Sequence, residues 1–185
     1  MLNYKKNLEL LTRNHVYSKE MEHDACGVGL IASTEGKKSR AVVEYGIEAL
    51  KAVWHRGAVD ADGKTGDGAG IHVEIPKDFF IEKIEVTGHD YDNSEICVGM
   101  IFLPRNDYSA QESCKTIVES ELTKNNFSIY GWRQVPVNPK VLGEKAFQTM
   151  PEIIQVLFKS NDQNLLDKNL ERKIYETRKK IENKA

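Results

Sequence analysis

Three apolar runs in the second half of the chain limit its possible folds more than any other feature. They lie at 95–104 (EICVGMIFLP), 127–137 (FSIYGWRQVPV) and 151–160 (PEIIQVLFKS), and each has the length and apolar character of a strand. The segment 110–124 between the first two has a helical pattern, which Asp107 is suited to cap. Long gaps between strand-like runs favour packed sheets flanked by helices over a helical bundle.

The first half of the chain continues this alternation. CGVGLIAS (26–33) and GIHVEI (70–75) are predicted to be buried strands. In the first of them, Gly27 and Gly29 would allow another backbone to come close. Between the two runs, residues 40–54 have apolar side chains at helical spacing, which predicts an amphipathic helix.

A charged helix is predicted at the end of the chain, over 166–184. Its apolar stripe is made by Leu165, Leu166, Leu170, Ile174 and Ile181. The predicted order of elements is therefore β-α-β-β-α-β-β-α.

The composition excludes several classes of protein. Hydrophobic residues make up 40% and charged residues 29% of the 185, which is typical of a globular domain. A net charge of −2 gives no reason to expect binding to nucleic acid or to an anionic membrane. The three cysteines, Cys26, Cys97 and Cys114, have no CxxC spacing, so we expect no disulfide framework or zinc site and predict a cytoplasmic location.

Cys26 allows two interpretations from its local sequence. A single cysteine at the start of a strand is most often a small buried hydrophobic residue. A thiol nucleophile needs a base, and no histidine in this sequence is placed persuasively for that role. An N-terminal cysteine can use its own α-amino group, which would require the removal of residues 1–25. The plainer interpretation of residues 1–24 is an N-terminal arm with one short helix near Leu8–Leu11.

The triplet His55-Arg56-Gly57 also has two interpretations. Basic residues followed by glycine are typical of a helix C-terminus, which explains the triplet adequately. The functional interpretation is an arginine that would be directed at a substrate or at the surroundings of the nucleophile.

Several motifs follow one another in an order that resembles a known family. HDACGVGLIAS (23–33) is followed by ALKAVWHRGAVDADGKTGDGAGIHVEIPKDFF (49–80), GWRQVPV (131–137), the segment 143–146 and PEIIQVLF (151–158). This set resembles the glutamine amidotransferase domain of the glutamate synthase large chain, from about Asp24 to the end of the chain. The resemblance implies a class II amidotransferase with an α+β fold, the four-layer αββα sandwich of the N-terminal-nucleophile hydrolases.

The resemblance also implies a site and a reaction. Residues 1–25 would be a propeptide, and cleavage of the Ala25–Cys26 bond would make Cys26 the N-terminal catalytic nucleophile. Cys26 would then hydrolyse L-glutamine to glutamate and ammonia through a thioester. Arg56 matches an arginine near the family's substrate site. The glycines expected to have structural roles near the nucleophile are Gly27, Gly66, Gly68 and Gly70.

The larger enzyme that the family implies contains further domains. In it the ammonia passes through a tunnel and aminates 2-oxoglutarate in a later domain that uses FMN and an iron–sulfur cluster. The implied partners are the remaining domains of the large chain and an electron-donating small subunit. For residues 26–185 themselves we expect no metal and no bound cofactor.

The sequence departs from the family pattern in one respect. The resemblance implies that the oxyanion hole, which includes an Asn-Gly pair, and a glutamine-binding arginine lie further along the domain, and no Asn-Gly dipeptide occurs in these 185 residues. We therefore expect residues 26–185 to be the N-terminal part of the domain, with an incomplete sandwich, exposed apolar faces and little glutaminase activity alone. Two alternatives are a non-catalytic fragment or split subunit, and a different N-terminal-nucleophile amide hydrolase.

Overall fold

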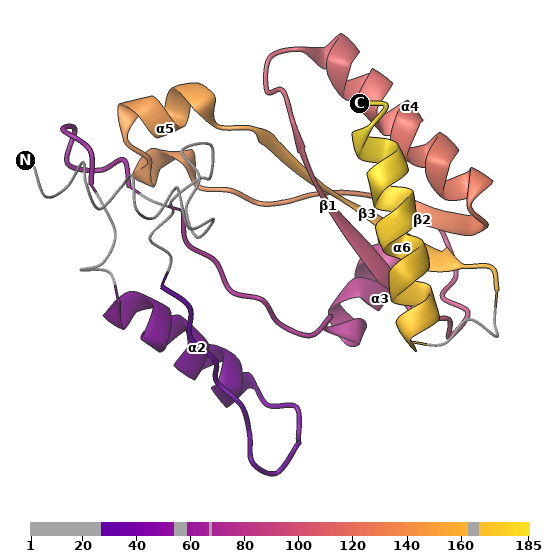
Figure 1. Cartoon of the computed structure of the whole chain (residues 1–185), viewed down its shortest axis with the longest axis horizontal. Helices are drawn as coiled ribbons and strands as arrows, with labels where there is room; N and C mark the ends of the chain where they lie inside the picture. The colour runs from indigo at the N-terminus through magenta and orange to yellow at the C-terminus, as the bar shows by residue number, and fades with distance from the viewer. Residues whose placement is uncertain (1–26, 54–58, 67, 163–166) are drawn as a thin grey trace, which may run out of the picture. The chain divides into compact units, whose positions relative to one another are not determined.

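The computed structural model describes residues 27–53, 59–66, 68–162 and 167–185. The chain divides into two compact units, Met1–Gly57 and Ala58–Ala185. Figure 1 follows the elements along the chain.

The second unit is built on a three-stranded antiparallel sheet in the order β1-β3-β2. The strands are β1 (Cys97–Leu103), β2 (Phe127–Gln134) and β3 (Glu152–Ser160). The central strand, β3, pairs with both neighbours, with Cys97 opposite Phe158 on one side and Phe127 opposite Ser160 on the other. All three strands predicted from the second half of the sequence are therefore confirmed.

One face of this sheet is covered by two helices, α4 (Tyr108–Lys124) and α6 (Asp167–Glu182). Alternate residues of the strands point to the same face, so this side collects one set of apolar side chains. The core consists of Cys97, Val118, Leu122, Phe127, Val156, Phe158 and Leu170. The predicted cap of α4 is confirmed, because the carboxylate of Asp107 accepts a hydrogen bond from the backbone N–H of Ala110 at 2.9 Å.

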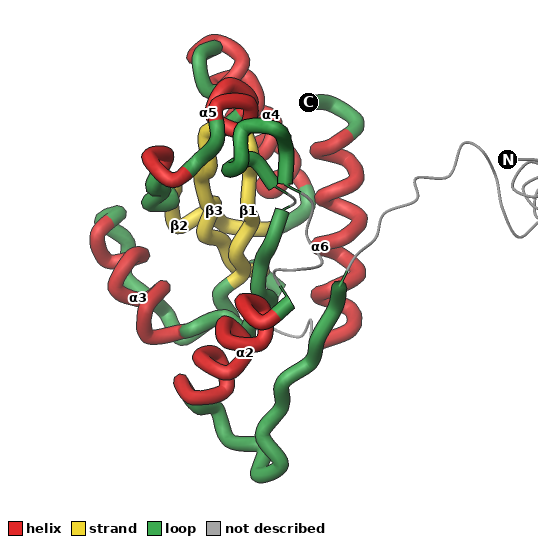
Figure 2. The backbone as a smooth tube through the Cα atoms, turned by 90° about the vertical axis from the view of Figure 1, so that its left-hand side faces the viewer, coloured by secondary structure: helices red, strands yellow, loops and turns green. Residues whose placement is uncertain are grey.

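The opposite face carries a helix that the sequence analysis missed, α3 (Lys77–Val86). Figure 2 shows α3 and α6 on opposite sides of the sheet. Phe80 and Ile84 of α3 pack with Ile96, Tyr130 and Leu157 to form a second core. The available signal was Pro76 before a helix-forming stretch with Asp78 in its first turn, which is typical of a helix start.

Beyond α3, part of this second face is open. Met100 and Phe102 of β1 remain 52% and 63% exposed. The mixture of helices and an antiparallel sheet confirms the α+β prediction. The sheet covered by α4 and α6 corresponds to one helical layer on one sheet of the expected four-layer αββα sandwich.

Two shorter elements, also missed from the sequence, follow β2. They are the 3-10 helix η2 (Pro139–Val141) and the helix α5 (Glu144–Thr149). Both lie between β2 and the central strand β3 in the chain.

The two strands predicted in the first half of the sequence are wrong. Residues 27–33 and 70–75 are not part of any β-ladder among the described residues. Val28 and Leu30 are 95% and 90% exposed, and Ile71 and Val73 are nearly half exposed. A strand needs a neighbour that accepts and donates its backbone hydrogen bonds, and an apolar sequence alone does not supply one.

The first unit contains the predicted amphipathic helix, α2 (Arg40–Ala52). Ser39 caps it, because its hydroxyl accepts a hydrogen bond from the N–H of Ala41 at 3.2 Å. None of its residues is buried. No helix in the described part of the chain is long and apolar enough to cross a membrane.

Candidate functional site

The two residues with the most direct predicted roles, Cys26 and Arg56, lie outside the described residues. Of the predicted site residues, the structure describes Gly27, Gly66, Gly68 and Gly70, and a loop leads into the glycine-rich segment that begins at Gly66. This loop, residues 59–66, is called here the DGKT loop after its central residues.

The DGKT loop is a tight turn whose two ends meet. Val59 and Gly66 form an antiparallel bridge, and the N–H of Asp60 donates to the carbonyl of Thr65 at 2.7 Å. Gly63 adopts a φ of 68°, a left-handed conformation that glycine reaches without steric cost. The glycine-rich segment therefore starts from a closed loop.

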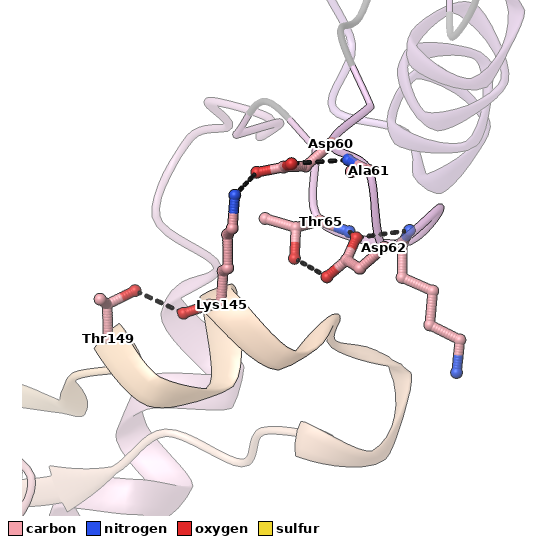
Figure 3. Close-up of polar contacts among 7 residues, drawn as sticks. Asp60, Ala61, Asp62, Thr65, Lys145 and Thr149 are labelled. Carbon is pink, nitrogen blue, oxygen red and sulfur yellow. Dashed lines mark hydrogen bonds and ion pairs between the residues drawn. The ribbon is translucent and has the colours of Figure 1, made fainter.

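Asp62 organises the interior of this loop (Figure 3). Its carboxylate accepts hydrogen bonds from the N–H groups of Lys64 and Thr65, at 2.9 and 2.7 Å, and from the hydroxyl of Thr65 at 2.5 Å. These bonds are stronger to an ionised acceptor than to a neutral one. The Thr65 hydroxyl, followed by the backbone amides of Thr65, Lys64 and Glu144, lowers the pKa of Asp62 from 3.8 to about 2.

The loop is also joined to α5, which lies far along the chain. The ammonium of Lys145 is 2.6 Å from the carboxylate of Asp60, and Figure 3 shows this side chain reaching from α5 to the loop. Sequence reasoning missed Asp60, Asp62, Thr65 and Lys145 as functional candidates. The signal was present in the motif segments 49–80 and 143–146, but nothing in the sequence indicated that they are in contact.

The predicted structural glycines differ in their surroundings. Gly66 closes the DGKT loop by its bridge to Val59. A Cβ atom placed on Gly27, Gly68 or Gly70 would meet no heavy atom of the described chain within 4 Å. Their roles beside the nucleophile stay predictions.

The two described cysteines are poor candidates for the nucleophile. Cys97 is buried in the core under α4 and α6, and burial raises the pKa of its thiol to about 12. Cys114 is half-buried on α4. The described ranges contain no group of three or more His, Cys, Asp or Glu side chains suited to hold a metal ion.

Comparison with known proteins places this chain in a family. Over 97% of its length it is 52% identical to the "Glutamate synthase [NADPH] large chain" of Azospirillum brasilense, of which it covers 12%. It is 40% identical to the "Ferredoxin-dependent glutamate synthase" of Pyropia yezoensis, over 94% of this chain and 11% of that protein. It is 41% identical to the "Ferredoxin-dependent glutamate synthase 1, chloroplastic/mitochondrial" of Arabidopsis thaliana, over 87% of this chain and 10% of that protein.

The chain thus spans about a tenth of the length of the curated relatives it matches. These relatives confirm the predicted resemblance to the glutamate synthase large chain. The family profile described as "Glutamine amidotransferases class-II" matches residues 26–185, beginning at the cysteine that the sequence analysis singled out. The chain belongs to the class-II glutamine amidotransferases.

Proposed function

We propose that this chain forms part of the glutamine-hydrolysing domain of a glutamate synthase, with Cys26 as its nucleophile after residues 1–25 are removed. The observation that carries the proposal is the start of the family match at residue 26, a cysteine preceded by 25 residues that the profile does not include. The identity of 52% to a glutamate synthase large chain supports the particular reaction.

In the proposed reaction, removal of residues 1–25 gives Cys26 a free α-amino group with a pKa near ~8. This amine takes the proton of the thiol, directly or through a water molecule, and the thiolate attacks the side-chain amide carbon of glutamine. The tetrahedral intermediate collapses when the amide nitrogen takes a proton and leaves as ammonia, so a γ-glutamyl thioester remains on the sulfur. Water then attacks the thioester, releases glutamate and returns the thiol.

We assign Arg56 to substrate binding. A guanidinium matches a carboxylate with two parallel hydrogen bonds, and the substrate carries a carboxylate at its α-carbon. The roles proposed for Gly27, Gly66, Gly68 and Gly70 are structural: positions without a side chain leave room for the nucleophile and for neighbouring backbone.

The rest of the reaction belongs to other parts of the larger enzyme. We propose that the ammonia aminates 2-oxoglutarate in a later domain with FMN and an iron–sulfur cluster, supplied with electrons by a partner. The names of the relatives point to NADPH in one case and ferredoxin in others. An iron–sulfur cluster needs several cysteine thiolates as ligands. Of the described cysteines, Cys97 packs in the apolar core and Cys114 is half-buried on α4. A reactive free thiol suits a reducing compartment, and we propose a cytoplasmic location.

Intact-mass measurement of the purified chain tests the proposal. We expect the loss of residues 1–25, and we expect Cys26→Ala to retain them because the cleavage needs the thiol. A glutamine-mimicking electrophile should then label Cys26, with Cys114→Ala as the matched control that keeps the labelling. Retention of the first 25 residues together with labelling of Cys97 or Cys114 would contradict the proposal.

A further inference from the structure

The contact between the DGKT loop and the start of α5 depends on the absence of a side chain at Gly143. A Cβ atom at this position would lie closer than 3.0 Å to the hydroxyl oxygen and backbone nitrogen of Thr65 and to a carboxylate oxygen of Asp62. The φ of Gly143 is −72°, which any residue adopts. Glycine is therefore needed here for space, and the space is taken by a loop that lies about eighty residues earlier in the sequence.

The two residues after Gly143 hold the same loop by polar contacts. The backbone amide of Glu144 contributes to lowering the pKa of the Asp62 carboxylate, and Lys145 pairs with Asp60 at 2.6 Å. Three successive residues thus act on the loop, Gly143 through close packing, Glu144 through its backbone amide and Lys145 through an ion pair. Figure 3 shows Asp60 and Asp62 facing the first turn of α5.

The helix α5 is itself tied to the sheet. The guanidinium of Arg105, in the turn after β1, lies 4.8 Å from the ring centre of Phe147 on α5. Gln111, buried on α4, donates to the carbonyls of Pro104 and Arg105 at 2.7 and 3.2 Å and so holds this turn in place. A continuous series of contacts therefore leads from the sheet through Arg105 and α5 to the DGKT loop.

We propose that Asp60, Asp62, Thr65, Gly143 and Lys145, called here the loop clamp, are positioning residues that fix Gly66, the residue at which the glycine-rich segment begins. Gly66 is both the closing residue of the loop and the first residue of the glycine-rich segment, so a displaced loop displaces the start of that segment. The catalytic consequence rests on the proposed function, in which this segment lies beside Cys26. On that basis we expect the loop clamp to affect the reactivity of Cys26 without touching the substrate.

Trypsin cleaves after lysine, and Lys64 lies inside the DGKT loop. The rate of cleavage after Lys64 therefore tests whether the loop is held against α5, called here docking, and this test does not depend on catalysis. In Gly143→Ala we expect native-state cleavage after Lys64 to be about tenfold faster or more, the effect of forcing a methyl group into a filled space. Lys145→Met should give a rise of about two- to fivefold, since the pair that it breaks is exposed. The matched control for Lys145→Met is Lys140→Met, which removes a tryptic site from the 3-10 helix η2. The matched control for Gly143→Ala is Gly46→Ala, because a Cβ atom at Gly46 has open space around it.

Amide exchange of β3 separates loop release from unfolding of the domain. If Gly143→Ala also increases the exchange of β3, the variants Thr65→Val and Thr65→Ser test the docking instead. Of the two, only serine keeps the hydroxyl that donates a hydrogen bond to Asp62. We expect faster cleavage for valine and near wild-type cleavage for serine. Unchanged cleavage in Gly143→Ala or in Thr65→Val, with β3 protected, would overturn the docking.

The second measurement concerns Cys26 in the same whole-chain variants. We expect the maximal rate of labelling by the glutamine-mimicking electrophile to fall at least about tenfold in Gly143→Ala, with little change in its half-saturating concentration. Faster tryptic cleavage with an unchanged labelling rate would overturn the positioning role while the proposed function stands. A wild-type chain that is not labelled at Cys26 would overturn the proposed function, and the trypsin result would still decide the docking.

Discussion

The hydroxyl of Tyr130 on β2 donates a hydrogen bond of 2.7 Å to the carboxylate of Asp92, in the loop that leads to β1. Lys159 of β3 pairs with the same carboxylate, and its ammonium lies 5.3 Å from the centre of the Tyr130 ring. Two strands and a loop thus meet at one carboxylate at the edge of the α3 core. Tyr130 is itself almost fully buried in that core.

We expect Tyr130→Phe to lower the free energy of unfolding by roughly 0.5–1.5 kcal/mol, because it removes this hydrogen bond and keeps the packing of the ring. Urea denaturation at neutral pH measures the change. Tyr175→Phe, on the exposed side of α6, is the matched control and should have no measurable effect. Equal stabilities of the two variants would contradict the role given to Asp92.

The same network predicts how stability depends on pH at both ends of the scale. Lys159 first, and then Tyr130, hold the pKa of Asp92 well below its usual 3.8, so its contribution is complete above about pH 4 and is lost as pH falls through the lower folded-state value. Burial and the hydrogen bond to Asp92 raise the pKa of Tyr130 above its usual 10, so its contribution is complete below about pH 10 and is lost as pH rises further. Asp92→Asn should flatten the acid limb of a plot of stability against pH. An acid limb unchanged by this substitution would contradict the assignment.

The position of Gly131 in the fold explains why the motif GWRQVPV begins with glycine. Its φ is 150°, and a Cβ atom there would lie 2.7 Å from Cγ2 and 2.9 Å from Cβ of Thr87. We expect Gly131→Ala to destabilise the fold by about 1–3 kcal/mol through this clash. Gly46→Ala, in the middle of α2 with open space around its Cβ, should instead favour the helix by roughly 0.5–1 kcal/mol. Chemical denaturation of the two variants checks the opposite signs.

The two described cysteines should differ in reactivity and in tolerance to substitution. Cys97 is 6% exposed and burial raises the pKa of its thiol, so alkylation at pH 8 should modify Cys114 well before Cys97. Cys97→Ser should cost roughly 1–3 kcal/mol because it places a hydroxyl in an apolar core. Cys114→Ser, on a half-buried helix position, is the control. Rapid alkylation of Cys97 in the folded chain would contradict its place in the core.

Glu121 anchors the end of α6 on α4. Its carboxylate is nearly inaccessible and lies 2.6 Å from the ammonium of Lys184 and 3.3 Å from that of Lys124. Lys184 is the main cause of a lowered pKa for Glu121, so Glu121 contributes to stability above about pH 4.5 and loses that contribution as pH falls further. We expect Lys184→Met to reduce the amide protection of the last turn of α6, and Lys168→Met, near the beginning of α6, to leave it unchanged. Exchange monitored by mass spectrometry distinguishes the two outcomes.

Local patterns in the sequence predicted the elements that depend mainly on residues near one another in the chain. Strands β1, β2 and β3, the helix α2 and the helix α4 with its Asp107 cap follow from periodicity and capping, because these depend on residues near one another in the chain. The order of the motifs likewise identified the family, and with it Cys26 as the predicted nucleophile.

Tertiary structure alone decided which apolar segments pair and which loops meet. Residues 27–33 and 70–75 have strand-like sequences, yet the described chain has no ladder for them, because backbone pairing depends on a neighbour that the segment does not encode. Gly143 has an ordinary φ, and only the position of Thr65 and Asp62 against it explains why a side chain does not fit. The sequence by itself therefore determined the family, the local elements and the predicted nucleophile, whereas the contact that holds the DGKT loop is a property of the folded chain, since it joins residues about eighty positions apart.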